Sequence, residues 1–201
     1  MEETDRERNG ETPEKGRADP VMDLSDWVQT LLLPILIGIL VFVFLARIIT
    51  VDGTSMVPTL HNGDRVVTSN LFYEPKPGDV VVLQTDSYGQ DPLVKRVIAV
   101  AGQTVDIDFD LGIVYVDGEA LDEPYIAEAT HRPLDFTGPR TVPEGCIFVM
   151  GDNRNRSTDS RDDRIGMVDE RCVIGRVLLV LIPASDEDGR RDWNRFGAVH
   201  G

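Results

Sequence analysis

The chain has 201 residues, of which 41% are hydrophobic and 27% are charged, so one medium-sized domain with a packed core can form. Its formal net charge is −15 at pH 7. Nucleic-acid binding requires a basic surface, and this acidic balance therefore argues against a nucleic-acid partner. The charge is instead typical of a solvated surface that keeps a protein soluble.

The first segment of the chain, residues 1–26, carries nine acids and four bases and shows no hydrophobic periodicity. A segment of this composition cannot bury enough apolar surface to offset the entropy lost on ordering. The sequence therefore predicts a disordered acidic tail over 1–26.

The next segment, residues 27–50, contains one charged residue, Arg47, and its run from Leu31 to Ala46 has no polar side chain. About 20 mostly apolar residues cross the hydrocarbon core of a bilayer as a helix. Trp27 stands where interfacial aromatic residues are common. We therefore expect one transmembrane helix over 27–50, with the lipid bilayer as a partner.

Two other interpretations of this apolar segment are less well supported. A cleaved signal peptide needs a basic start and a small-residue cleavage site, whereas the preceding tail is acidic and no such site occurs before Asp52. A buried core helix is the other alternative, but this segment is apolar on all faces and long enough to cross a bilayer. Basic residues in the tail favour a single-pass topology with a cytoplasmic N-terminus and the following domain on the extracytoplasmic side.

From Val51 onward, short runs of Val, Ile, Leu and Tyr alternate with turn signals such as Asn62-Gly63 and Asp117-Gly118. These runs predict strands over 65–68, 79–84, 93–101, 104–108, 112–116, 146–150 and 173–182. The fold class is therefore mainly β, with a compact antiparallel β-sheet domain over 51–184 that follows the transmembrane helix. A polar, frayed C-terminal tail is expected over 185–201.

The chain has two cysteines, Cys146 and Cys172. They can form a disulfide in an oxidising compartment, or remain two separate buried thiols. The sequence leaves both alternatives open, because disulfide formation depends on the distance between the two residues.

The first candidate for chemistry is Ser55, within Gly53-Thr54-Ser55-Met56-Val57-Pro58. A glycine before the serine and a proline after it are typical of a bent loop that presents a hydroxyl group. Taken alone, the pattern also fits an ordinary turn serine whose hydroxyl is hydrogen-bonded within the loop.

The second candidate is Lys95, one of three lysines in the chain. Lys15 lies in the acidic tail and Lys76 in a proline-rich turn, whereas Lys95 lies inside the apolar strand 93–100. Alternation along the strand places it on the face of Leu93, Val97 and Ala99. Burial there lowers the pKa of a lysine, and a neutral amine can act as a general base. The alternative is a strand-edge lysine that reaches water.

The third candidate is the polar segment 151–161, which follows the strand 146–150. Its Asp and Asn spacing suggests a calcium loop, but Ser157 stands where that loop needs glycine and no glutamate follows at the required position. We interpret the segment as a network of carboxylates, guanidinium groups and hydroxyls that holds catalytic groups in place. A histidine-based triad is disfavoured, because none of the three histidines lies in a strand.

In their order along the chain, these features resemble the bacterial type I signal peptidase family over residues 28–182. The blocks that carry the resemblance are Gly53–Leu60, Pro77–Val82, Val94–Val97, Tyr115–Gly118, Asp122–Tyr125 and Gly151–Arg161. The resemblance implies a membrane-bound serine endopeptidase that removes N-terminal signal peptides from secretory preproteins after small-X-small motifs such as Ala-X-Ala. It implies a monomer that uses no metal and no cofactor.

The resemblance also implies roles for individual residues. Ser55 matches the nucleophile, Lys95 the general base, and Ser157 the hydroxyl that fixes the lysine amine. Two ion pairs are expected to support the site, Asp152 with Arg96 and Asp159 with Arg161. The residues expected to contact substrate are Val51, Gly53, Met56 and Val94.

The oxyanion hole is the least defined part of this expectation. The Ser55 backbone N–H is expected to supply one donor. Some family members have a serine hydroxyl as the second donor, and Gly53 stands at that position here. The sequence therefore leaves the second donor open.

Two other functions deserve comparison with this one. Self-cleaving Ser/Lys peptidases of the SOS-repressor type resemble the same β fold, but they are soluble and carry a DNA-binding domain, which the apolar segment and acidic tail speak against. A non-catalytic membrane-anchored binding protein is the other alternative. Retention of Ser55, Lys95 and Ser157 together argues against it.

Overall fold

In the computed structural model, residues 20–85, 91–186 and 188–199 are described, and within the N-terminal helix the side chains of 27–40 are described. The chain separates into two compact units, Met1–Phe42 and Val43–Gly201, and each is considered by itself. Most of the predicted acidic tail, residues 1–19, lies outside the described residues.

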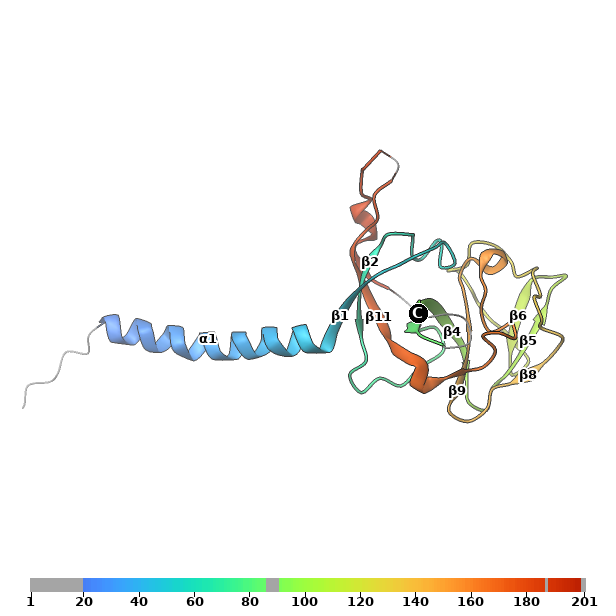
Figure 1. The fold of residues 1–201 in the computed structure, drawn as a ribbon, viewed down its shortest axis with the longest axis horizontal. Coiled ribbons are helices and arrows are strands. Elements are labelled where there is room, and N and C mark those ends of the chain that lie inside the picture. The colour runs from blue at the N-terminus through green and yellow to red at the C-terminus, as the bar shows by residue number, and fades with distance from the viewer. Residues whose placement is uncertain (1–19, 86–90, 187, 200–201) are drawn as a thin grey trace, which may run out of the picture. The chain divides into compact units, whose positions relative to one another are not determined.

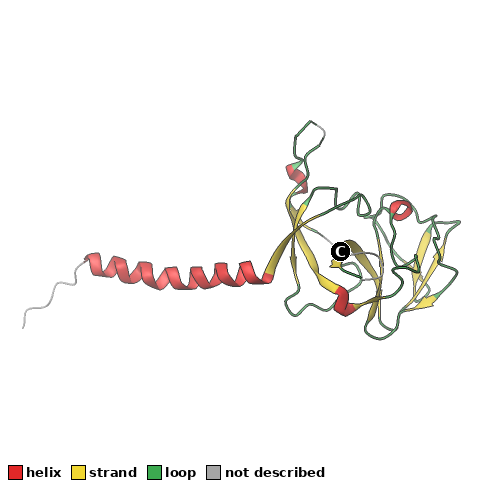
Figure 2. Ribbon diagram, in the orientation of Figure 1, coloured by secondary structure: helices red, strands yellow, loops and turns green. Residues whose placement is uncertain are grey.

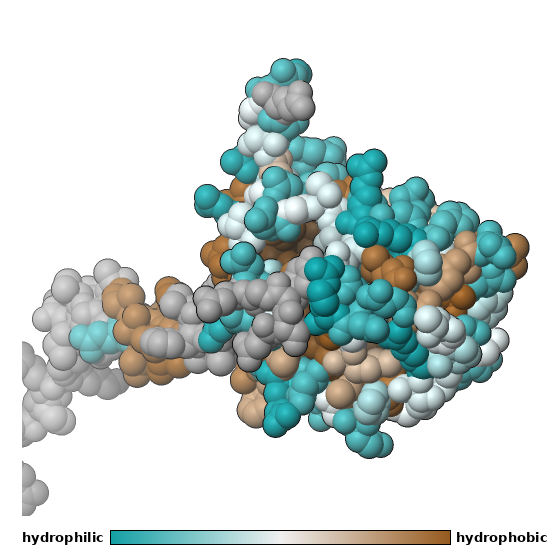
Figure 3. Space-filling model, turned by 45° about the vertical axis from the view of Figure 1, so that its right-hand side comes forward, coloured by the Kyte–Doolittle hydropathy of each residue, from teal (hydrophilic) through white to brown (hydrophobic). Residues whose placement is uncertain are grey.

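The first unit is built around α1 (Pro20–Leu45). Proline suits the first position of a helix, because the N–H that it lacks would have no partner within the helix there. The helix begins and ends earlier than the predicted range of 27–50. Its described side chains are all exposed, and Figure 3 shows hydrophobic residues along this part of the helix.

The expectation of a transmembrane helix over 27–50 is not confirmed. Within the described residues, the structure contains no helix whose length and hydropathy together suffice for a membrane crossing. The last part of the predicted range is wrong, because Ala46–Thr50 forms the strand β1 and pairs antiparallel with the strand that follows it. Its Ile, Ile and Thr residues are β-branched, which favours a strand over a helix.

The second unit is mainly β, as predicted, and Figures 1 and 2 show two sheets of unequal size. The large sheet has the strand order β1-β2-β11-β3-β4-β9-β10, with β12 also paired to β11. The other strands of this sheet are β2 (Arg65–Ser69), β3 (Val80–Leu83), β4 (Leu93–Val100), β9 (Cys146–Met150), β10 (Val168–Asp169), β11 (Val173–Ile182) and β12 (Gly197–Ala198). Every pairing described in it is antiparallel.

The small sheet has the order β7-β6-β5-β8. Its strands are β5 (Thr104–Asp108), β6 (Ile113–Val116), β7 (Glu119–Ala120) and β8 (Arg140–Thr141). Three short 3-10 helices complete the described elements, η1 (Arg154–Arg156), η2 (Glu170–Cys172) and η3 (Trp193–Arg195). The seven strands that the sequence predicts, β2, β3, β4, β5, β6, β9 and β11, begin and end within a residue or so of their predicted ranges. The alternating apolar pattern marks them clearly.

The core consists of three apolar clusters. One joins the two sheets, since it contains Ile98 and Phe148 of the large sheet together with Val105 and Val114 of the small sheet. A second lies around Val51, and a third lies along β3 and β9. Burial of this apolar surface supplies most of the driving force for folding, and it fixes β4 between two partners.

Two further expectations need correction. The pairing of β4 with β9 shifts register between Val97 and Ala99, so simple alternation does not hold along the whole strand. The C-terminal segment is not a frayed tail, because it contains η3 and the strand β12, which pairs with β11.

Of the two alternatives for the cysteines, the structure has the unpaired one, since Cys146 and Cys172 are both free thiols.

Candidate active site

The structure brings Ser55 and Lys95 into contact. Ser55 lies half-buried in the nucleophile loop, by which we mean residues 53–58 between β1 and β2. Lys95 lies on β4 and is 3% exposed. Its Nζ lies 3.0 Å from Ser55 Oγ and 3.0 Å from the backbone oxygen of Val94. A primary amine on an interior strand of the large sheet and a serine hydroxyl of the loop therefore share one hydrogen bond.

Burial gives this lysine an unusual pKa. Loss of hydration lowers the pKa of Lys95 from 10.5 to about 8, while the charges of Asp159 and Asp152 act in the opposite direction. At pH 7 about one amine in ten would then be neutral, against about one in three thousand at the ordinary pKa. The site thus holds an amine that can accept a proton near neutral pH.

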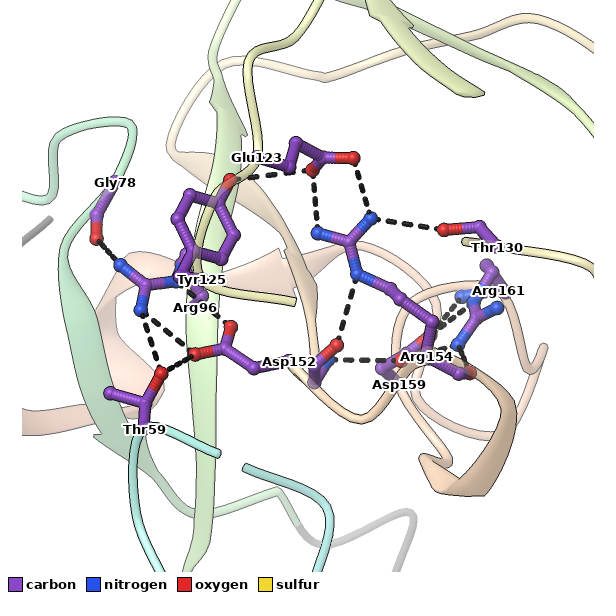
Figure 4. Close-up of polar contacts among 11 residues, drawn as sticks. Thr59, Gly78, Arg96, Glu123, Tyr125, Thr130, Asp152, Arg154, Asp159 and Arg161 are labelled. Atoms are coloured by element: carbon purple, nitrogen blue, oxygen red, sulfur yellow. Dashed lines mark hydrogen bonds and ion pairs between the residues drawn. The ribbon is translucent and has the colours of Figure 1, made fainter. Parts of the chain in front are cut away.

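Arg96, the neighbour of Lys95, forms a buried ion pair with Asp152. The guanidinium group donates two hydrogen bonds to the carboxylate, at 2.9 and 2.8 Å, and both side chains are fully buried. Arg96 also donates to the Gly78 carbonyl at 2.7 Å, and the Tyr125 ring lies over it at 3.9 Å. Thr59, the residue that follows the nucleophile loop, also donates to Asp152. Figure 4 shows how this group surrounds the carboxylate.

The second expected pair, Asp159 with Arg161, is also buried. The Arg161 Nε donates to Asp159 Oδ1 at 2.8 Å, and Asp159 Oδ2 accepts the Gly151 N–H at 3.1 Å. Arg161 further donates to the backbone carbonyls of Arg132 and Arg154. These contacts fix the polar loop, residues 151–161, from its two ends.

A third buried pair, Glu123 with Arg154, was not predicted. Arg154 donates to the two carboxylate oxygens at 2.9 and 2.6 Å and to Thr130 at 3.0 Å (Figure 4). Its side chain is fully buried, and that of Glu123 is 6% exposed. The one signal for it in the sequence is the block Asp122-Glu123-Pro124-Tyr125, which does not by itself indicate an ion pair. The three pairs together satisfy three guanidinium groups away from water.

Ser157 is buried beside the nucleophile loop. Its Oγ is a buried atom that makes no hydrogen bond within the described residues. A Cβ added to Gly151 would meet Ser157 and would lie 2.5 Å from the backbone oxygen of Ser55. Glycine is therefore required at 151, because any side chain would push the polar loop away from Ser55.

The residues expected to contact substrate fall into two groups. Val51, Met56 and Val94 belong to one apolar cluster and are 3%, 1% and 8% exposed. Gly53 is exposed and has a φ of +89°, which favours glycine, and its N–H donates to Asn62 Oδ1 at 2.9 Å. The first group forms an apolar floor near Ser55, whereas Gly53 shapes the loop backbone.

The side-chain nitrogen that contacts Ser55 Oγ belongs to Lys95. His131 Nδ1 contacts the Phe109 carbonyl, and His200 lies outside the described residues. Burial lowers the pKa of His61, and the charge of Arg195 lowers it further. Within the described part of the chain, no group of three His, Cys, Asp or Glu side chains is arranged to hold a metal ion.

Comparisons with known proteins agree with this geometry. Residues 24–182 match the family model described as signal peptidase, peptidase S26. The chain is 38% identical to signal peptidase I of Bacillus licheniformis, over 81% of this chain and 91% of the relative. It is also 38% identical to a protein of Synechocystis sp. named probable signal peptidase I-1, over 89% of this chain and 90% of the relative.

A solved structure is similar as well, the crystal structure of a signal peptidase I from Enterococcus faecalis V583. It is 30% identical, with a TM-score of 0.42, over 52% of this chain and 97% of that one. The family model covers most of the chain, and the relatives exceed 30% identity over nearly their whole length. The chain therefore belongs to the signal peptidase family, peptidase S26, and is a serine endopeptidase.

Proposed function

We propose that the protein removes signal peptides from exported preproteins by means of a Ser55 nucleophile and a Lys95 general base. The observation that carries the proposal is the 3.0 Å contact between Lys95 Nζ and Ser55 Oγ, made by a lysine that is 3% exposed. Family membership supports the reaction class, and the buried amine supports the assignment of the two residues.

In the first step, the neutral Lys95 amine takes the Ser55 hydroxyl proton while Oγ attacks the scissile carbonyl carbon. The protonated amine then gives this proton to the leaving amine of the mature protein, and the signal peptide remains attached to Oγ as an ester. A water molecule next gives a proton to Lys95 and attacks the ester, which releases the signal peptide and restores Ser55. One amine thus serves in turn as base and acid in both halves of the reaction.

Negative charge develops on the carbonyl oxygen in both steps, and we assign the Ser55 backbone N–H as one donor to it. Gly53 has no side chain that can donate, so the second donor remains unassigned. Ser157 is buried in the adjacent polar loop, but its Oγ makes no hydrogen bond to the lysine amine within the described residues, so its role in positioning that amine stays a prediction.

Preference for small-X-small sequences follows from the apolar floor near Ser55. Val51, Met56 and Val94 are almost fully buried, and they leave little depth for a substrate side chain. A peptide pressed against this floor could place only small side chains there, because a larger one would have to displace packed core residues. The alternative of a self-cleaving repressor is less well supported, because the family match covers residues 24–182 with signal peptidases.

We further propose that the enzyme acts at the membrane, as a monomer, with its catalytic unit on the extracytoplasmic side. The support is the exposed apolar surface of α1. Eight Leu and Ile side chains between positions 31 and 40 are exposed there, and Trp27 is exposed as well. Large exposed apolar surfaces mark sites of contact with membranes or partners. The full-length protein should sediment with membranes; recovery in the soluble fraction would contradict this placement.

The catalytic assignment is tested by cleavage of a purified preprotein. The variants Ser55→Ala and Lys95→Ala should each lose activity by at least about 1,000-fold, as expected when a nucleophile or its base is removed. Lys76→Ala is the matched control, since Lys76 is exposed and lies outside the site, and it should retain full activity. Near-normal turnover by either of the first two variants would refute the assignment.

A further inference from the structure

Asn153 makes two hydrogen bonds to consecutive carbonyl groups of the nucleophile loop. Its side-chain Nδ2 donates to the Thr54 carbonyl at 3.1 Å, and its backbone N–H donates to the Ser55 carbonyl at 2.9 Å. Asn153 is 8% exposed, so both bonds are shielded from water. Ninety-nine positions separate Asn153 from Thr54 in the sequence, and neither bond belongs to a strand pairing.

The bond to Thr54 has a consequence for catalysis because the peptide unit is planar. The Thr54 carbonyl and the Ser55 N–H belong to the same trans peptide, so they point in opposite directions. A donor that holds the carbonyl therefore also fixes the direction of the N–H. That N–H is the group that the proposed function assigns as an oxyanion donor.

Asn153 is itself held in place by its neighbours. Asp152 is fixed by the buried guanidinium group of Arg96. Gly151, which precedes Asp152, lies so close to the Ser55 carbonyl that an added Cβ would be 2.5 Å away from that oxygen. The segment 151–153 is thus pressed against the nucleophile loop by two independent constraints, and its amide has little freedom to leave Thr54.

We propose that Asn153 is a positioning residue that aims the Ser55 N–H at the developing oxyanion. The inference rests on the proposed function, since it presupposes that Ser55 is the nucleophile. It also has particular weight in this chain, because Gly53 cannot supply a hydroxyl as a second donor. With one assigned donor, stabilisation of the oxyanion depends more strongly on the direction of that N–H than it would with two donors.

The test compares Asn153→Ala with wild type on a peptide that spans a preprotein cleavage site. The variant loses the side-chain donor but keeps the backbone bond to the Ser55 carbonyl. Since removal of an oxyanion donor costs about 100- to 1,000-fold in kcat, misdirecting one should cost roughly 10- to 100-fold. KM should change little, and the midpoint of the pH profile should not move, because Asn153 carries no charge.

Asn155→Ala is the matched control. Asn155 belongs to the same polar loop, but it accepts hydrogen bonds from the N–H groups of His131 and Arg132 and donates to the Ala129 carbonyl. Its side chain makes three hydrogen bonds to a different loop, so its loss should leave kcat within about twofold of wild type if orientation of Ser55 is what matters. An equal loss of kcat in both variants would mean a general effect on the loop and would overturn the proposal.

A peptide aldehyde provides the second readout, because its adduct with Ser55 places a tetrahedral oxygen at the oxyanion position, whereas the corresponding peptide alcohol forms no adduct and carries no anionic oxygen. Asn153→Ala should weaken aldehyde binding in parallel with kcat/KM and leave binding of the peptide alcohol unchanged. Should this variant fail to fold, Asn153→Leu keeps the shape of the side chain without its donor and takes the same measurements. Wild-type kcat and aldehyde affinity in the folded variant would overturn the proposal.

The Ser55→Ala variant separates the two hypotheses. If it is inactive while Asn153→Ala behaves as wild type, the positioning role is wrong and the proposed function stands. If Ser55→Ala remains active, the proposed function itself fails, whatever the behaviour of Asn153.

Discussion

At the scale of single residues, Lys95 combines a catalytic advantage with a cost in stability. Burial removes water from the amine and holds its pKa at about 8, below the ordinary 10.5. The unfolded chain therefore binds more protons than the folded protein between these two values. Stability rises with pH across this window, and below pH 8 the folded protein bears the full cost of burying a charged amine.

We expect Lys95→Met to stabilise the protein while abolishing its activity. The pKa difference predicts a gain of roughly 3–4 kcal/mol in the free energy of unfolding below pH 8, because each unit corresponds to about 1.4 kcal/mol. The gain should shrink as pH rises towards 10.5. Urea unfolding of wild type and variant at about pH 7 and pH 10 measures it.

The exposed Lys76→Met is the control for this measurement and should alter stability by less than about 0.5 kcal/mol. A Lys95→Met variant no more stable than wild type at the lower pH would show that Lys95 titrates as an ordinary lysine.

The sequence marks Ser55 and Lys95 as candidates through their surroundings, a serine in a bent loop and a lysine in an apolar strand. Each pattern alone also fits an ordinary residue, and the expected roles come from the order of the family motifs. The sequence assigns no role to Asn153, since asparagine is common in polar loops and its partner lies far away in the sequence. The Glu123–Arg154 pair was missed for the same reason. Which polar side chains form hydrogen bonds with one another depends on the tertiary arrangement of the loops. Local sequence patterns do not indicate that arrangement.

At the scale of elements, the C-terminal segment departs most from expectation. Its polar composition predicted a frayed tail, but Arg195 of η3 donates to both carboxylate oxygens of the fully buried Asp64. Burial alone would raise the pKa of Asp64, but hydrogen bonds from Arg195 and from the N–H groups of His61 and Ala184 lower it below its ordinary value. One long-range ion pair thus holds the segment in place, although its polar composition favours a frayed tail.

Loss of this ion pair should be costly. Arg195→Met leaves the Asp64 carboxylate buried with no cation beside it, and removing one partner of a buried pair predicts a destabilisation of roughly 2–4 kcal/mol, at the lower end because Arg195 is partly exposed. Thermal and urea unfolding at neutral pH measure the effect. Asp64 remains charged there, so the full penalty applies.

Arg190 offers a matched control for that variant, because it belongs to the same segment and pairs with Asp188 while both side chains are mostly exposed. Arg190→Met should cost no more than about 0.5 kcal/mol. Equal losses from both arginine variants would indicate that the segment as a whole is being disturbed and would contradict a specific role for the Asp64–Arg195 pair.

The opposite error occurred at β1, where an apolar run was assigned to a helix. Apolar residues continue from α1 into Ala46–Thr50, and a continuous apolar run does not reveal by its periodicity where a helix changes to a strand. Pairing decides the matter, since β1 forms a full antiparallel ladder with β2. Residues near an element boundary are therefore settled by partners that are distant in sequence.

At the scale of the whole molecule, the mainly β class and seven of the eight strands of four or more residues could be predicted, because alternation of apolar residues records which face is buried; β1 is the exception. The order of the motifs predicted the family, and the comparisons confirm it. The small sheet strands of two residues were not predicted, as they are too short to show a period. Two of the three buried arginine–carboxylate pairs around the polar loop were expected from the family resemblance, whereas the Glu123–Arg154 pair was not.

The central claim is that a neutral, buried Lys95 amine activates Ser55, and the pH dependence of kcat/KM tests it most directly. Because the unprotonated amine is the active form, activity should rise with pH through a midpoint near 8, the pKa of Lys95 in the free enzyme. Lys76→Ala should reproduce this curve. A midpoint above about pH 10, where an ordinary lysine titrates, or a profile with no basic group at all, would contradict the account.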